Sequence, residues 1–186
     1  MAEPAYVTLT LPLKIGPIER GDFWEDPLSE KLEEQGIGAV TGGGTMMSQD
    51  GGIEFVDLEV ELEAIDDGKL DALVAAMVAI GAPKGTKIVN DDGETLRTLG
   101  SISVVGIGLD GTGLPDSAYE GFDADAFSDE IVAQLGEGYS YGGSHAGARY
   151  TFFYYHGADA ERIKEGLGKI AAEKPIGQGA KIEQIA

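Results

Sequence analysis

Cysteine is absent from this chain of 186 residues, and only two histidines are present. The absence of cysteine excludes disulfide bonds, thiolate catalysis and metal sites with cysteine ligands. Long apolar runs are absent as well: none approaches the roughly 18 residues that a membrane-spanning helix requires, so we expect no membrane insertion. The first residues lack the basic and apolar regions of a secretory signal, and we therefore expect a cytoplasmic protein.

Basic residues are scarce: 13 Lys and Arg face 33 Asp and Glu, which gives a net charge of -20. Nucleic acids and anionic membrane surfaces are poor partners for such a chain, because phosphate binding depends on Lys and Arg releasing condensed counterions. The charge is uneven, with 20 acids and 7 bases in residues 1–99 against 13 acids and 6 bases in 100–186. A functional acidic surface is therefore expected in the first half, although high solubility or a salt-adapted host explains the charge equally well.

Glycine is abundant, and its positions reveal an internal repeat. Four glycines recur at a shift of 100 positions, since Gly36, Gly38, Gly42 and Gly43 match Gly136, Gly138, Gly142 and Gly143. A second echo follows in the same order, where residues 85–88 (GTKI) match 179–182 (GAKI). The repeat predicts two structural units. The polar, turn-forming stretch 90–94 lies between them, so the expected units are 1–94 and 95–186.

Each half predicts the same order of elements. In the first half we expect strands at 6–11, 39–41, 53–62 and 86–89, with helices at 27–35, capped by Asp26, and at 69–80. In the second half we expect strands at 102–109, 139–141, 150–155 and 180–185, with helices at 125–135 and after Asp159. The order β-α-β-β-α-β, present twice, predicts an α+β protein of tandem duplicated ferredoxin-like units with antiparallel sheets.

The strand expected at 53–62 has two unlike faces. Apolar residues alternate with Asp57, Glu59 and Glu61, so the three carboxylates point to the face away from the helices. Three aligned carboxylates are not buried without partners, and this face is expected to meet solvent or a docking partner. Asp57, Glu59 and Glu61 are therefore candidate residues for binding a basic protein.

The equivalent strand of the second half, 150–155, reads YTFFYY and carries aromatic residues on both faces. A strand that is apolar on both faces expects cover on both. We expect the other half or a second copy of the chain to supply that cover, as in a homodimer. The alternative is a ligand pocket near the second hairpin, for which the candidate residues are Tyr139, Tyr141, His145, Arg149 and Tyr150.

No motif points to catalysis, a metal or a cofactor. The glycine clusters lack the Gly-x-Gly-x-x-Gly spacing of a phosphate loop, and we expect them to form hairpin turns. His145 and His156 are expected at opposite ends of one strand, about 20 Å apart at 3.3 Å per residue, which argues against a shared metal site. We therefore predict no catalytic residues, no metal ligands and no cofactor.

Three stretches carry a resemblance: 25–28 (EDPL), 42–45 (GGGT) and 81–86 (GAPKGT). Over the first half, the chain resembles small bacterial proteins of unassigned function built on a ferredoxin-like unit. In composition, as a small, acidic, cysteine-free α+β chain, it is similar to immunity proteins that neutralise toxic bacterial enzymes. The resemblance implies no catalytic residues.

Three functions remain open at this point. The first hypothesis is a non-enzymatic cytoplasmic binding protein, of the immunity type or similar, whose acidic surface takes a basic protein. The second is a small-molecule-binding or catalytic pocket near the second-half hairpin, so the sequence leaves the question of enzymatic activity open. The third is a structural homo-oligomer without a ligand.

Overall fold

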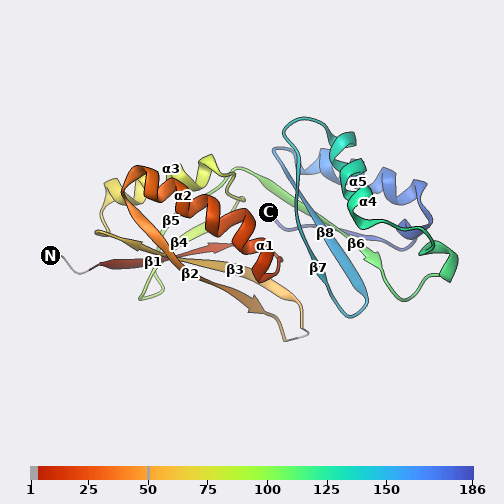
Figure 1. The fold of residues 1–186 in the computed structure, drawn as a ribbon, viewed down its shortest axis with the longest axis horizontal. Helices are drawn as coiled ribbons and strands as arrows, with labels where there is room; N and C mark the ends of the chain where they lie inside the picture. Colours follow the sequence, from red (N-terminus) through yellow and green to blue (C-terminus); the bar gives the residue numbers. More distant parts are fainter. Residues whose placement is uncertain (1–3, 50) are drawn as a thin grey trace. The chain divides into compact units, whose positions relative to one another are not determined.

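The protein is described from a computed structural model that covers residues 4–49 and 51–186. The chain divides into two compact units, Met1–Ser101 and Ile102–Ala186. Each unit is an antiparallel sheet with two long helices on one of its faces (Figure 1). Each is described by itself.

The first unit is a five-stranded sheet in the order β2-β3-β1-β4-β5. Its elements are, in chain order, β1 (Ala5–Leu11), α1 (Pro17–Arg20), the π-helical η1 (Gly21–Glu25), α2 (Asp26–Gln35), β2 (Gly38–Met47), β3 (Ile53–Leu62), α3 (Asp67–Ala79), β4 (Thr86–Asn90) and β5 (Thr95–Leu99).

The second unit is a four-stranded sheet in the order β7-β8-β6-β9. Its elements are β6 (Ser103–Asp110), the short helix η2 (Asp116–Ala118), α4 (Ala124–Leu135), β7 (Ser140–Ala146), β8 (Tyr150–Gly157), α5 (Ala160–Glu173), the short helix η3 (Pro175–Gly177) and β9 (Lys181–Gln184). The first four strands of both sheets follow the same order, second-third-first-fourth, and all pairs are antiparallel. This confirms the duplicated ferredoxin-like α+β architecture.

Alternating strand residues form the core of each unit. In the first unit Leu9 and Leu58 are fully buried, as are Leu28 of α2 and Leu73 of α3. In the second unit the core joins the inward residues of β6 and β8 to those of α4 and α5: Val105, Ile107, Leu109, Phe127, Ile131, Leu135, Phe153, Tyr155, Ile163, Leu167 and Ile170. The helices therefore bury one face of each sheet and leave the other helix-free.

The prediction that the repeated glycines form hairpin turns is wrong for those nearest the hairpins. Residues 42–44 lie inside β2, and residues 142–143 lie inside β7. Both strands are irregular beside these glycines, with register shifts between Val40 and Gly42 and between Tyr141 and Ser144. At most of these positions the side chains of neighbouring residues lie against the strand backbone, and only glycine leaves room for them.

Two further boundaries differ from expectation. The first helical segment begins at Pro17 rather than at the expected cap Asp26, because Gly16 starts it and the π turn of η1 carries it into α2. Trp24 in that turn is buried. After the turn at 90–94 the chain forms β5, which pairs with β4 and so extends the first sheet beyond residue 94.

Glycines also support the helix-free face of the second sheet. A Cβ placed on Gly108 would lie 2.6 Å from the ring of Phe152, and one on Gly106 would lie 2.6 Å from the ring of Tyr154. These two rings stack nearly parallel, at 11° with centroids 6.1 Å apart. The absence of side chains on β6 thus lets the aromatic rings of β8 lie across it.

We expect Gly108→Ala to destabilise the second unit by about 1–3 kcal/mol, because the new methyl group displaces the Phe152 ring. Gly168→Ala is the matched control: this helical position has space for a Cβ, so the substitution is expected to stabilise by up to about 1 kcal/mol. Urea unfolding measures the effect of both substitutions. Six of the seven tyrosines lie in the second unit, so tyrosine fluorescence reports mainly that unit, while Trp24 reports the first. Equal effects of the two substitutions would contradict the packing described.

Candidate functional site

The acidic row, Asp57, Glu59 and Glu61, lies on the helix-free face of the first sheet. Strand β3 carries it between β1 and β2, and the residues between the acids are buried against the helices. Across β1 the row faces Thr10, Thr8 and Tyr6, and across β2 it faces Gly44, Gly42 and Ala39. The face therefore has hydroxyl groups on one side of the carboxylates and almost no side chains on the other.

Hydrogen bonds tie the two outer carboxylates to β1. The hydroxyl of Thr10 donates to Asp57 Oδ1 at 2.7 Å, and that of Tyr6 donates to Glu61 Oε2 at 2.9 Å. The bond to Glu61 raises the pKa of the Tyr6 phenol above its ordinary value, because ionisation would remove the donor proton. Glu59, in the middle, is exposed, and its carboxylate lies over Gly42 instead.

Little positive charge balances the row. Within residues 4–49 and 51–186 no ion pair includes any of its three carboxylates. The basic residue in register on the same face is Lys87, which is exposed on β4 and lies opposite Thr10. It is two strands from Asp57, about 10 Å at the usual strand spacing. The row therefore presents an unneutralised negative surface.

A second acidic surface lies on the helical side of the first unit. An open hollow of about 430 Å³ is lined by Asp22, Asp26, Pro27, Ser29, Glu30 and Glu33. All its charged groups are acidic. It is a competing place for a cation, and any binding experiment has to tell the two surfaces apart.

The five candidate residues of the second hairpin separate into groups. The ring of Tyr139 lies against Gly157, with the Arg162 guanidinium 5.2 Å from its centroid. Tyr141 packs towards the core, where its ring lies 5.9 Å from that of Tyr155. These two tyrosines are therefore packing residues of the helix-covered side.

The other three candidates lie nearer the turn between β7 and β8. His145 is opposite Phe152, and the Tyr150 ring is flanked by Arg149 at 5.4 Å and by the Lys181 ammonium at 4.1 Å. Arg149 donates two hydrogen bonds to Asp110 Oδ2, of 2.7 and 3.1 Å. Its guanidinium is thus already paired with a carboxylate.

The two histidines are closer together than predicted. His145 pairs with Phe152, four residues from His156 along β8, which corresponds to about 13 Å rather than 20 Å. Burial lowers the pKa of His156 to about 4, so its ring stays neutral near pH 7. Among the residues described, no group of three His, Asp or Glu side chains is placed to hold a metal ion.

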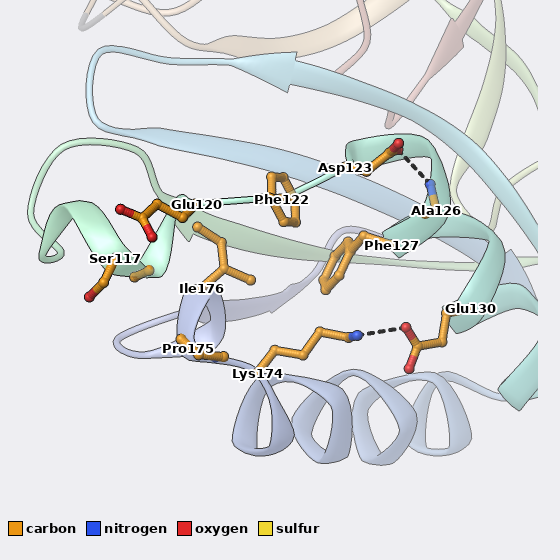
Figure 2. A pocket seen from close by; sticks show the side chains of 12 residues that line it. Ser117, Glu120, Phe122, Asp123, Ala126, Phe127, Glu130, Lys174, Pro175 and Ile176 are labelled. Atoms are coloured by element: carbon orange, nitrogen blue, oxygen red, sulfur yellow. Dashed lines mark hydrogen bonds and ion pairs between the residues drawn. The ribbon is translucent and has the colours of Figure 1, made fainter.

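A cavity of about 270 Å³ lies elsewhere in the second unit, and none of the five candidates lines it. Figure 2 shows Phe122 and Phe127 on one side of it and Pro175 and Ile176 on the other. The two phenylalanine rings meet edge to face at 5.5 Å.

Charged groups line the rim of this cavity. Lys174 Nζ pairs with Glu130 Oε2 at 2.7 Å, and the Asp123 carboxylate accepts a hydrogen bond from the amide of Ala126, which caps α4. Glu120 and Ser117 complete the polar lining. Sequence reasoning missed this site because its walls come from segments 117–130 and 174–176, which no motif connects.

Comparisons with known proteins place the chain in no family. No family model matches it, and no curated protein matches it. Solved structures similar to this chain include an unknown protein from Galdieria sulphuraria (14% identity, 98% of both chains, TM-score 0.28) and the regulatory subunit of aspartate kinase from Thermus flavus (17% identity, 90% of this chain and 94% of that one, TM-score 0.28). At these TM-scores neither similarity supports a functional argument. No helix in the described part of the chain is long and apolar enough to cross a membrane.

The ion pair between Asp110 and Arg149 affects the pKa of the Asp110 carboxyl. The hydrogen bond from Arg149, followed by those from the amides of Thr112 and Gly113, lowers the pKa of Asp110 to about 2. Because the folded-state pKa lies below the ordinary value of about 3.9, the stabilisation is present above pH 4 and is lost as the pH falls through about 2.

We expect Arg149→Gln to raise the pKa of Asp110 while leaving it below the ordinary value, since the two amide donors remain. Carboxyl NMR titration measures this, with Arg162→Gln as a control of equal charge change that leaves Asp110 untouched. An unchanged Asp110 pKa in Arg149→Gln would show that the guanidinium does not hold this carboxylate.

Proposed function

We propose that this protein is a non-enzymatic binding protein that takes a basic protein partner on its acidic row. The observation that carries the proposal is the row itself: Asp57, Glu59 and Glu61 lie side by side on a helix-free sheet face, without an ion-pair partner in the described chain. A partner with Lys or Arg in matching positions would complete these pairs.

The distribution of charge supports the same proposal. The net charge is -20, and most of the excess acid lies in the first half of the sequence. The negative electrostatic field of such a protein accelerates association with a cationic partner more than it strengthens the final complex. We further propose a cytoplasmic setting and an immunity-type role, in which a small acidic bacterial protein neutralises a basic enzyme.

The triple variant Asp57→Ser, Glu59→Gln, Glu61→Gln tests the row. With a fluorescent lysine-rich peptide as the probe, we expect its association rate constant to fall by about tenfold at low salt and its salt dependence to flatten, because steering depends on unscreened charge. Stopped-flow mixing across a range of salt concentrations measures both quantities.

The matched control removes three exposed acids from the helices of the second unit: Asp129→Asn, Glu165→Gln and Glu173→Gln. It makes the same change in net charge, and we expect a much smaller effect on the rate. Equal slowing by the two triple variants would show that net charge alone attracts the peptide, and the row would lose its assigned role.

A second candidate function is the binding of a small amphipathic molecule in the cavity of the second unit. Phe122, Phe127 and Ile176 offer apolar walls, and the charged rim has more acids than bases. Such a lining suits an aromatic amine, whose ring contacts the phenylalanines and whose ammonium faces Glu120.

Phenethylamine is a direct probe of this candidate. We expect it to shift the NMR signals of Phe122, Phe127 and Ile176, while phenylpropionate of similar size has a weaker effect. Ala126→Trp should abolish the shifts by filling the cavity, whereas Ala133→Trp, on an exposed position of the same helix, should not. Shifts that persist in Ala126→Trp would place the ligand elsewhere.

A further inference from the structure

The outer edge of β2 is an unpaired strand edge. Strand β2 is the terminal strand of its sheet, so its outward N–H and C=O groups have no partner strand among the described residues. Proteins usually protect such an edge with Lys, Pro or inward charges. The ten residues of β2 are GAVTGGGTMM, with no charged residue and no proline. The shifts in its register against β3 are the one feature of the strand that disfavours pairing with a further strand.

Glycine removes the side chains that would separate this edge from the acidic row. Gly42 lies opposite Glu59 and Gly44 lies opposite Asp57. The Glu59 carboxylate extends over β2, since Oε2 is 3.0 Å from the place of a Cβ on Gly42. At Gly44, no atom of the described residues outside 43–45 lies within 4 Å of such a Cβ. The acids are therefore accessible from beyond the edge strand.

The helical side fixes β2 in place. Arg20 Nε pairs with Glu25 Oε1 at 2.5 Å, and the pair lies against Gly43, where any Cβ would collide with it. The Arg20 side chain is largely buried, and its Nη1 donates to Thr45 Oγ1 at 2.8 Å. Because these contacts on the helical side hold β2 in place, the strand is already ordered before a partner binds. This lowers the entropic cost of binding.

We propose that the partner binds as an extended segment that adds a strand to the outer edge of β2, with Lys or Arg at alternating positions. The backbone of the segment pairs with β2, and its cationic side chains pass over Gly42 and Gly44 to Glu59 and Asp57. An added strand lies two strand spacings from β3, about 10 Å, so only long side chains reach the row. This inference rests on the proposed function and names the form of its partner.

The equivalent edge of the second unit can be compared with the outer edge of β2. The edge strand of that unit, β7, keeps the matching glycine, Gly142, but the ring of His156 occupies the place of a side chain there. Strand β8, beside it, bears no acidic residue. The same scaffold therefore lacks both features that make the first edge a site for a cationic strand.

Two peptides of equal charge test the strand addition on the full chain. The first alternates threonine and lysine, and the second is the same peptide with N-methyl groups on both its threonine and its lysine amides, which block strand pairing at either edge of the peptide. We expect the methylated peptide to bind at least about tenfold more weakly. We also expect the first peptide alone to slow amide exchange in residues 38–47, while 140–146 stay unchanged.

The variant Gly44→Lys tests the site from the protein side. The new side chain has space, so the fold is expected to persist, and it places a fixed cation beside Asp57 at the edge. We expect the alternating peptide to bind at least about tenfold more weakly, whereas Ser140→Lys, the same charge change on β7, leaves its affinity nearly unchanged. Unchanged spectra outside β2 and β3 establish that Gly44→Lys is folded.

The outcomes separate this inference from the proposed function. If both peptides bind equally and Glu59→Gln weakens both equally, the acidic row binds cations without an added strand, and this inference falls while the proposed function stands. If neither peptide binds, both fall. If sedimentation shows a dimer that Gly44→Lys dissociates, the edge belongs to a second copy of the chain, and the basic partner segment is overturned.

Discussion

The alternation of β3 ties the packing of the first unit to its surface chemistry. Leu58 and Val60 are fully buried against the helices, and the strand geometry then forces Asp57, Glu59 and Glu61 to the opposite face. A slip of one residue would bury three carboxylates and expose the core, so the register is strongly fixed. Because the helices of the unit cover only the other face, none of them covers the acidic row.

The two units show how one scaffold supports different surfaces. The helix-free face is acidic in the first unit, whereas in the second it is aromatic, with Phe152 and Tyr154 lying across glycines of β6. In both units glycine makes room for a neighbour, but the neighbours differ. Over Gly42 that neighbour is a carboxylate that faces outward, and over Gly106 and Gly108 it is a ring that covers the sheet.

The sequence was sufficient for the elements that depend on local signals. Alternating apolar residues predict β1 and β3, and the helix expected after Asp159 is confirmed, with the Asp159 side chain accepting backbone hydrogen bonds at its start. Strand β5 and the π turn around Trp24 were missed, because pairing with β4 and burial of the indole depend on tertiary contacts. The strand glycines were misread because a turn and a bulged strand use the same residue.

The candidate site was only partly predictable in the same way. Strand alternation placed the acidic row on the face away from the helices, but the openness of the β2 edge followed only from the register that sets Gly42 beside Glu59. The most direct test is the NMR chemical shift of the Glu59 side-chain carboxyl, followed while the alternating lysine peptide is added. We expect the peptide to move the Glu59 carboxyl signal more than those of Asp22, Asp26, Glu30 and Glu33; shifts of the helix-side acids with the Glu59 signal unchanged would contradict binding at the acidic row.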